Sequence, residues 1–240
     1  MKIRIVAPQE SVKKENLFVP LFLNAPLEKE EFFSLLPDAV RRMLAEFAAQ
    51  NFRGSEGEQK ILWLGKKDGD APSSSRGLRR IVLFGLGERK KWYERKNHLL
   101  ARRYVHIAKK ERIGEFAAVL PLFLSTDTGL ADTARNFCID AIMADFEFTK
   151  YKTEKNTDNA PLREITLAIS PAARREALRG IEEAAIIGQE TNACRELANT
   201  PGSDMTPATL AQEAARVAKK SGIRITVLDA SVSFMSSSSN

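Results

Sequence analysis

The sequence predicts an α/β protein built on a mixed, mostly parallel sheet flanked by helices. One observation favours this fold class, and a second bounds the size of the protein. First, short apolar runs of strand length alternate along the chain with segments whose apolar residues recur at helical spacing, and such alternation is typical of a sheet covered by helices. Second, the chain has 240 residues, of which 43% are hydrophobic. This is enough for one buried core and a substantial further piece.

The predicted strands are short and rich in β-branched or apolar residues. They are Lys2–Ala7, Leu17–Leu23, Lys60–Gly65, Arg80–Gly85, Glu115–Leu122 and Arg163–Ile169. Pro20 implies that the second strand lies at a sheet edge or ends early, because proline cannot donate a backbone hydrogen bond. The third and fourth strands are expected to be buried, and the polar segment Asp68–Ser75 between them is expected to be a mobile loop.

The predicted helices have apolar residues on one face and charged residues on the other. They run from Pro37 to near Gly54, from Trp92 to Arg112, from Asp132 to Phe148 and from Ser170 towards Leu197. Ser170 is the expected N-cap of the last helix, with Pro171 at its first position. We interpret residues 1–169 as an N-terminal α/β domain and residues 170–200 as a long connector helix.

A second, incomplete α/β unit is expected after the connector. Thr206 is expected to cap a helix that begins at Pro207, and Gly222 is expected to end it. Residues Arg224–Asp229 alternate in polarity, which predicts a strand. Residues 230–240 form a serine-rich tail.

The chain is basic, with a net charge of +6 and an isoelectric point near 9.3. The excess is concentrated between Arg76 and Arg112, mostly on a predicted helix. One hypothesis is that this region binds DNA or another polyanion; the alternative is a solvated helix face or a subunit contact. The candidate polyanion contacts are Arg79, Arg80, Arg89, Lys90, Lys91, Arg95, Lys96, Arg102 and Arg103.

The sequence carries no signal for secretion or for a membrane. Residues Met1–Pro8 are too few and too charged for the apolar part of a signal peptide, and no apolar run approaches membrane-spanning length. The two cysteines, Cys138 and Cys194, fall in predicted helices and are expected to be buried free thiols. We therefore expect a cytoplasmic protein with no membrane partner.

No catalytic, cofactor-binding or metal-binding residue is predicted. The segment Gly85-Leu86-Gly87 follows a predicted strand, but the third glycine of a dinucleotide fingerprint would fall at Lys90, so a tight turn is the better interpretation. His98 and His106 lie on one predicted helix without a carboxylate at ligand spacing, so we expect exposed or partly packed side chains. The sequence contains no G-x-S-x-G motif of a serine hydrolase.

Three segments carry a family resemblance. They are Arg80–Glu88 followed by the basic helix, Ala141–Lys152, and Arg195–Pro207 followed by Leu210-Ala211 and Val227–Asp229. In this order they resemble segments of the leucyl (cytosol) aminopeptidase family. The third is the most specific, because it resembles the junction between that family's connector helix and its catalytic domain. Together the three segments lie within residues 76–229.

The resemblance implies a macro-domain-like N-terminal domain and a parent enzyme that removes N-terminal residues from peptides. In that family a lysine and several carboxylates downstream of the junction hold two divalent metal ions, Zn or Mn, and the enzyme is a hexamer. Some bacterial members also bind DNA. The family's metal-binding motifs are not found in this sequence. Asn156-Thr157-Asp158 resembles the start of one motif, but Asn159-Ala160-Pro161 follows it where the family has Ala-Glu-Gly-Arg, so we interpret it as a polar loop.

The resemblance therefore implies a structural and assembly module. We expect residues 201–229 to be the beginning of a truncated metallopeptidase catalytic domain, and we expect this chain alone to be inactive. The same resemblance implies a homo-oligomer, a hexamer, and a peptide substrate only in the intact enzyme.

Overall fold

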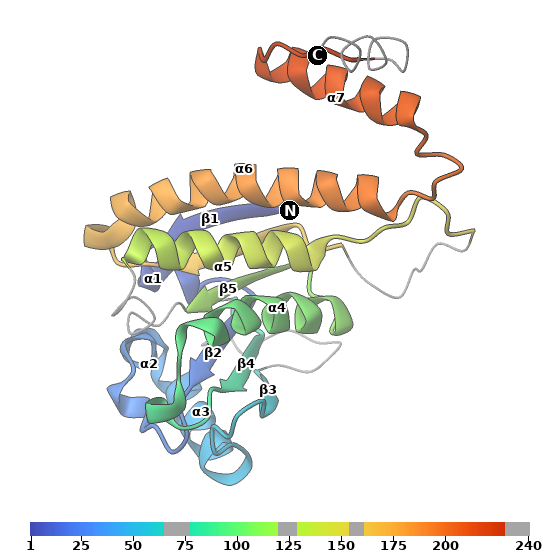
Figure 1. Ribbon diagram of the computed structural model, residues 1–240. Helices are drawn as coiled ribbons and strands as arrows, with labels where there is room; N and C mark the ends of the chain where they lie inside the picture. The colour runs from blue at the N-terminus through green and yellow to red at the C-terminus, as the bar shows by residue number, and fades with distance from the viewer. Residues whose placement is uncertain (65–76, 120–128, 154–160, 229–240) are drawn as a thin grey trace. The chain divides into compact units, whose positions relative to one another are not determined.

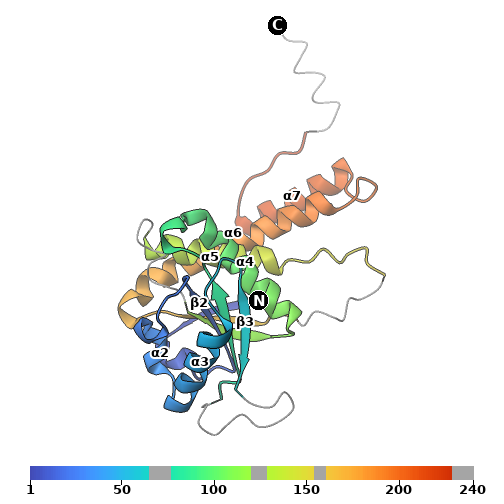
Figure 2. The ribbon, with the colours of Figure 1, turned by 90° about the horizontal axis from the view of Figure 1, so that it is seen from below.

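The computed structural model describes residues 1–64, 77–119, 129–153 and 161–228. The chain divides into two compact units, Met1–Glu190 and Thr191–Asn240. The described part of the first unit contains a six-stranded sheet with the order β1-β6-β5-β2-β4-β3 (Figure 1, Figure 2). The strands are β1 (Lys2–Val6), β2 (Asn16–Leu21), β3 (Gln59–Trp63), β4 (Arg80–Gly85), β5 (Glu115–Val119) and β6 (Glu164–Ala168).

The sheet is mixed and mostly parallel, which confirms the predicted fold class. Neighbouring strands from β1 to β4 run parallel, and only β3 is antiparallel to its neighbour β4 in the described part of the chain. The chain enters the centre of the sheet at β2 and crosses from β4, on one side of β2, to β5, on the other side. Crossovers of this kind place helices against the faces of the sheet.

Helices cover both faces of the sheet (Figure 1). On one face lie α2 (Glu31–Leu35) and α3 (Asp38–Asn51); on the other lie α4 (Glu94–Lys110), α5 (Leu130–Asp145) and the first part of α6 (Arg174–Asn199). Short connecting turns are α1 (Pro8–Ser11) and the 3-10 turns Leu27–Lys29, Arg89–Lys91 and Pro171–Ala173.

The alternation of side chains along β2 produces two hydrophobic cores. Leu17 and Val19 are fully buried among the residues of the α3 face, which include Leu44. Phe18, between them in sequence, is fully buried on the opposite face, where its ring stacks on Phe116 at 4.2 Å. A strand that is apolar on both faces is what a central strand of a helix-covered sheet requires.

Helix α6 packs on α5 through small residues. Ala177, Gly180, Ala184 and Gly188 are buried along one stripe of the helix. A methyl carbon placed on Gly180 would lie 2.9 Å from the carbonyl carbon of Ala131 on α5. The two helix backbones therefore approach closely only because this position has no side chain.

The described part of the second unit contains the end of α6 and the helix α7 (Pro207–Ser221). The backbone N–H of Thr209 donates to Thr206 Oγ1 at 3.2 Å, and Gly222 ends the helix in the left-handed conformation, with φ of 67°. Both predicted caps are confirmed. The boundary between the two units falls inside the predicted connector helix.

Pro20 does not mark an edge of the sheet. Strand β2 lies between β5 and β4, so the edge alternative is wrong, whereas the other alternative, an early end, is confirmed because β2 ends at Leu21 and not at Leu23. In the described part of the chain β2 pairs with β5 only at Leu17 and Phe18, whereas its pairing with β4 continues through Pro20 to Leu21. Pro20 thus follows the stretch that is paired on both sides, and there a missing N–H is tolerated.

Three further predictions are wrong in detail. Strand β3 lies at the edge of the sheet. It is not a buried strand, because Lys60 and Trp63 are exposed and only Leu62 is buried. Ser170 precedes the 3-10 turn Pro171–Ala173 and not α6 itself, and its side chain makes no capping hydrogen bond. Residues 223–228 have no regular secondary structure. A strand needs a neighbouring strand for its hydrogen bonds, and the described part of the second unit contains none.

Some predictions fall outside the described residues. They concern the loop Asp68–Ser75, the segment Asn156–Asp158 and the tail 230–240.

Candidate functional site

The predicted polyanion contacts lie on and around α4, which is amphipathic. One face of this helix carries the buried residues Leu100, Tyr104 and Ala108, which pack in the core. The outward positions Arg102 and Arg103 are exposed. Helical spacing therefore separates the basic residues from the apolar ones, as the sequence predicts.

The structure does not bring all the predicted contacts together. Arg80 lies near the end of α4, where its Nη1 atom donates to the backbone oxygen of Glu111 at 3.4 Å. Arg89, Lys90 and Lys91 form the turn that precedes the start of α4. The helix has 17 residues and is therefore roughly 24 Å long, at about 1.5 Å per residue. The two groups of basic residues lie at its opposite ends.

Many of these basic side chains are held by carboxylates of the same chain. The ion pairs are Arg79 with Glu15 at 3.3 Å, Lys91 with Glu88 at 2.6 Å, Lys96 with Glu56 at 2.8 Å and Arg102 with Asp140 at 2.9 Å. The side chain of Arg95 lies outside the described residues. Because paired cations have less charge to offer a phosphate, these contacts favour the alternative of a solvated helix face. Polyanion binding stays a prediction.

Asp140 on α5 is the centre of a contact between α4 and α5 that the sequence does not reveal. Its carboxylate is 5% exposed and accepts hydrogen bonds from Arg102 Nε and Nη2 at 3.1 and 2.9 Å. His98 Nδ1 contacts the other carboxylate oxygen. His98 is thus partly packed and His106 is exposed, as predicted; the carboxylate beside His98 comes from a distant part of the chain. A buried carboxylate needs such partners to offset its lost hydration.

The Gly85-Leu86-Gly87 turn at the end of β4 packs against the loop 53–58. A methyl carbon on Gly85 would lie 2.8 Å from the carbonyl carbons of Gly54 and Ser55. The backbone N–H groups of Gly85 and Gly87 donate to the carbonyl oxygens of Glu58 and Gly54, at 2.8 and 2.9 Å. These glycines thus permit the close approach of two backbone segments. This role supports the interpretation of the segment as a tight turn and not as a phosphate-binding loop.

A carboxylate of the loop 53–58 binds the backbone N–H groups of the same loop. The Glu58 carboxylate accepts hydrogen bonds from the backbone N–H groups of Arg53, Gly54 and Ser55, at 3.1, 3.0 and 3.0 Å. Successive N–H groups arranged in this way form a nest of the kind that binds anions. Because Glu58 fills the nest, these donors are not available to a phosphate.

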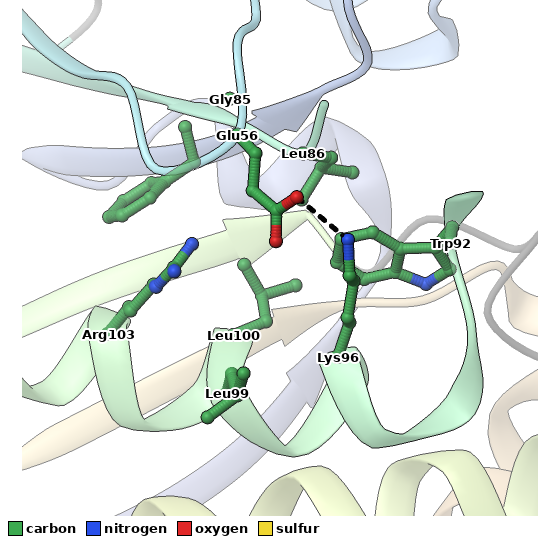
Figure 3. A pocket seen from close by; sticks show the side chains of 9 residues that line it. Glu56, Gly85, Leu86, Trp92, Lys96, Leu99, Leu100 and Arg103 are labelled. Carbon is green, nitrogen blue, oxygen red and sulfur yellow. Dashed lines mark hydrogen bonds and ion pairs between the residues drawn. The ribbon is translucent and has the colours of Figure 1, made fainter. Parts of the chain in front are cut away.

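A small pocket lies beside this turn, at the carboxyl end of β4 (Figure 3). Glu56, Lys96 and Arg103 supply its charged side chains, and the rest of its wall is Phe84, Gly85, Leu86, Trp92, Leu99 and Leu100. Its enclosed part has room for about one water molecule. The hydrogen bond from Lys96 lowers the pKa of Glu56, and the nearby charges of Lys96, Arg103 and Lys91 add to this effect. Glu56 is thus held as an anion.

The described residues contain no cluster of three or more His, Cys, Asp or Glu side chains that could hold a metal ion. Cys138 is buried, and burial raises the pKa of its thiol to about 12. Cys194 is exposed, so its predicted burial is wrong. No helix in the described ranges is long and apolar enough to span a membrane.

Comparison with known proteins identifies the family. Residues 21–155 match the model of the cytosol aminopeptidase family, N-terminal domain. This match covers more than half of the chain. The chain belongs to the cytosol aminopeptidase family. The predicted resemblance to the N-terminal domain of leucyl (cytosol) aminopeptidases is confirmed.

Relatives within the cytosol aminopeptidase family are longer than this chain. The probable cytosol aminopeptidase of Bacillus subtilis is 29% identical over 164 residues, which are 67% of this chain and 32% of the relative. That of Roseiflexus castenholzii is 32% identical over 158 residues, or 65% of this chain and 32% of the relative. The chain thus spans about a third of the length of these relatives.

Solved structures show the same fold. A mutant of tomato leucine aminopeptidase superposes with a TM-score of 0.73 at 22% identity, over 98% of this chain and 46% of the tomato chain. The bottromycin maturation enzyme BotP, in complex with Mn, superposes with a TM-score of 0.58 at 17% identity, over 87% of this chain and 37% of BotP.

Proposed function

We propose that this chain is the structural and assembly domain of a metal-dependent aminopeptidase that removes N-terminal residues from peptides. The observation that carries the proposal is the family match over residues 21–155, a range that runs from the end of β2 to beyond α5. The names of the relatives, probable cytosol aminopeptidases, support both the activity of the parent enzyme and a cytoplasmic location.

The metal ions of the proposed enzyme do not fit the described residues. A pair of Zn or Mn ions requires several carboxylate or similar ligands at one place. The described part of the chain offers no such cluster, and its ion-paired carboxylates, such as Asp140 and Glu56, are held by basic side chains. The proposed contribution of this chain is therefore structural.

The second unit is proposed to begin the catalytic domain. The likeness to tomato leucine aminopeptidase extends over 98% of this chain, so α7 falls within the matched region. The sequence that resembles the family's domain junction, Arg195–Pro207, lies directly before α7. Both observations support the assignment of residues 201–229 to the next domain.

The assembly role is tested by the mass of the purified chain in solution. Sedimentation velocity over a range of concentrations is expected to show a homo-oligomer, and a hexamer if the chain alone carries the family's assembly contacts. A monomer at every concentration would contradict the assembly part of the proposal. The family assignment would stand, because it rests on the sequence match.

A further inference from the structure

The pocket at the carboxyl end of β4 has an uneven balance of charge. Lys96 Nζ donates to Glu56 Oε2 at 2.8 Å, and Figure 3 shows the Glu56 carboxylate between Lys96 and Arg103. Lys91, which also acts on Glu56 electrostatically, is paired with Glu88. One carboxylate therefore faces two cationic side chains in the pocket wall.

Arg103 retains its hydrogen-bonding capacity. A guanidinium has five N–H donors, yet within the described ranges Arg103 has neither a hydrogen bond nor an ion pair. Its side chain is exposed and belongs to the pocket wall. Because a guanidinium binds the two oxygens of a carboxylate or phosphate with parallel hydrogen bonds, this position suits an oxyanion.

Glu56 can leave its position without disturbing the loop that carries it. Its side chain is 52% exposed, whereas that of Lys96 is 11% exposed. The loop backbone is fixed by other contacts, namely the Glu58 carboxylate and the hydrogen bond from Gly57 N to Gly85 O at 3.0 Å. Rotation of Glu56 into solvent would therefore leave Lys96 and Arg103 in place.

We propose that this pocket is an oxyanion site, in which a carboxylate or phosphate group of a small ligand replaces Glu56 between Lys96 and Arg103. Side chains hold the anion, because the nearby backbone N–H groups of Gly85 and Gly87 are already bonded. The exposed side chain of Leu99, which also lines the pocket, contacts the body of the ligand. Because the enclosed volume has room for only about one water molecule, the anionic group takes the space that the Glu56 carboxylate leaves, and a nucleotide does not fit. The site does not depend on the proposed peptidase role.

The chain contains a convenient reporter for this site. It has two tryptophans: Trp92 lines the pocket, and Trp63 lies on the edge strand β3 against Arg80. The substitution Trp63→Phe leaves Trp92 as the single indole. Its fluorescence is measured while sodium phosphate or sodium acetate replaces sodium chloride at constant ionic strength, so that a general salt effect is removed.

A saturable change in Trp92 fluorescence is expected with at least one of the two anions, and the anion that produces it identifies the ligand chemistry. Glu56→Gln should tighten this binding about tenfold, because the competing like charge is removed. Arg103→Gln should abolish it, and the matched control Arg79→Gln, at the opposite end of β4, should leave it unchanged. The proposal is overturned if neither anion binds in the Glu56→Gln background, or if Arg103→Gln and Arg79→Gln behave alike.

Discussion

The contact between α5 and α6 gives the sharpest prediction on stability. Gly180 of α6 lies against the α5 backbone, and a methyl carbon there would lie 2.9 Å from the carbonyl carbon of Ala131 and 3.1 Å from the backbone nitrogen of Arg135. Both atoms belong to the main chain of a helix, so neither can move away by a side-chain rotation. The substitution Gly180→Ala must push the two helices apart.

The expected magnitude follows from two opposing effects. Forcing an extra carbon into a close-packed contact costs about 1 to 3 kcal/mol, and the upper end applies because the obstacle is backbone. Alanine is favoured over glycine inside a helix by about 1 kcal/mol. The net loss in the free energy of unfolding is therefore about 2 kcal/mol.

Urea unfolding followed by far-UV circular dichroism measures this loss. For a slope of about 2 to 3 kcal/mol per molar urea, the midpoint should fall by roughly 0.7 to 1 M. Gly202→Ala is the matched control, since a methyl carbon there has no neighbour within 4 Å, and its effect should stay within about 0.5 kcal/mol. An unchanged or raised midpoint for Gly180→Ala would refute the close-contact argument.

Three further predictions concern single side chains. Tyr104→Phe should leave stability unchanged or raise it by up to about 1 kcal/mol in the same urea assay, because the buried hydroxyl has no hydrogen-bond partner in the described structure. A thiol reagent at pH 8 should label Cys194 alone in the native protein and Cys138 only after unfolding, since Cys138 is buried and its pKa is about 12; labelling of both in the native state would contradict this. Thr206→Ala should weaken α7 by about 1 kcal/mol, seen as faster hydrogen exchange at the start of α7, because its hydroxyl accepts from Thr209 N.

The sequence correctly predicts those elements that are determined by residues close together in the chain. The apolar run of β4 and the capping residues Thr206 and Gly222 each act within a few residues of chain, so their interpretation needs no partner. The correct placement of the turn at Gly85 rests on the same kind of local pattern.

Features that depend on distant residues were missed. The contact between His98 and Asp140 joins residues 42 positions apart, and helix periodicity cannot reveal it. The chemistry of Pro20 indicates either an edge strand or an early strand end, and only the extent of pairing with β5 distinguishes the two. Residues 223–228 have the polarity pattern of a strand, but a strand also needs a partner.

The same limit applies to the candidate site. The sequence locates the basic residues, but it does not show that Lys96 and Arg102 are paired with carboxylates from other parts of the chain. The pocket around Glu56 depends on the close approach of the loop 53–58 to β4, and this approach is a tertiary contact. A signal was nevertheless present, since Gly54, Gly85 and Gly87 mark the positions where two backbones meet.

We propose that this chain has a structural role in its family and performs no hydrolysis itself. The most direct test is the release of 4-nitroaniline from leucine 4-nitroanilide by the purified chain, with added Mn²⁺ or Zn²⁺ and with a chelator as control. The account predicts no release above the protein-free rate with either metal. Metal-dependent release that follows the purified chain and disappears with the chelator would contradict it.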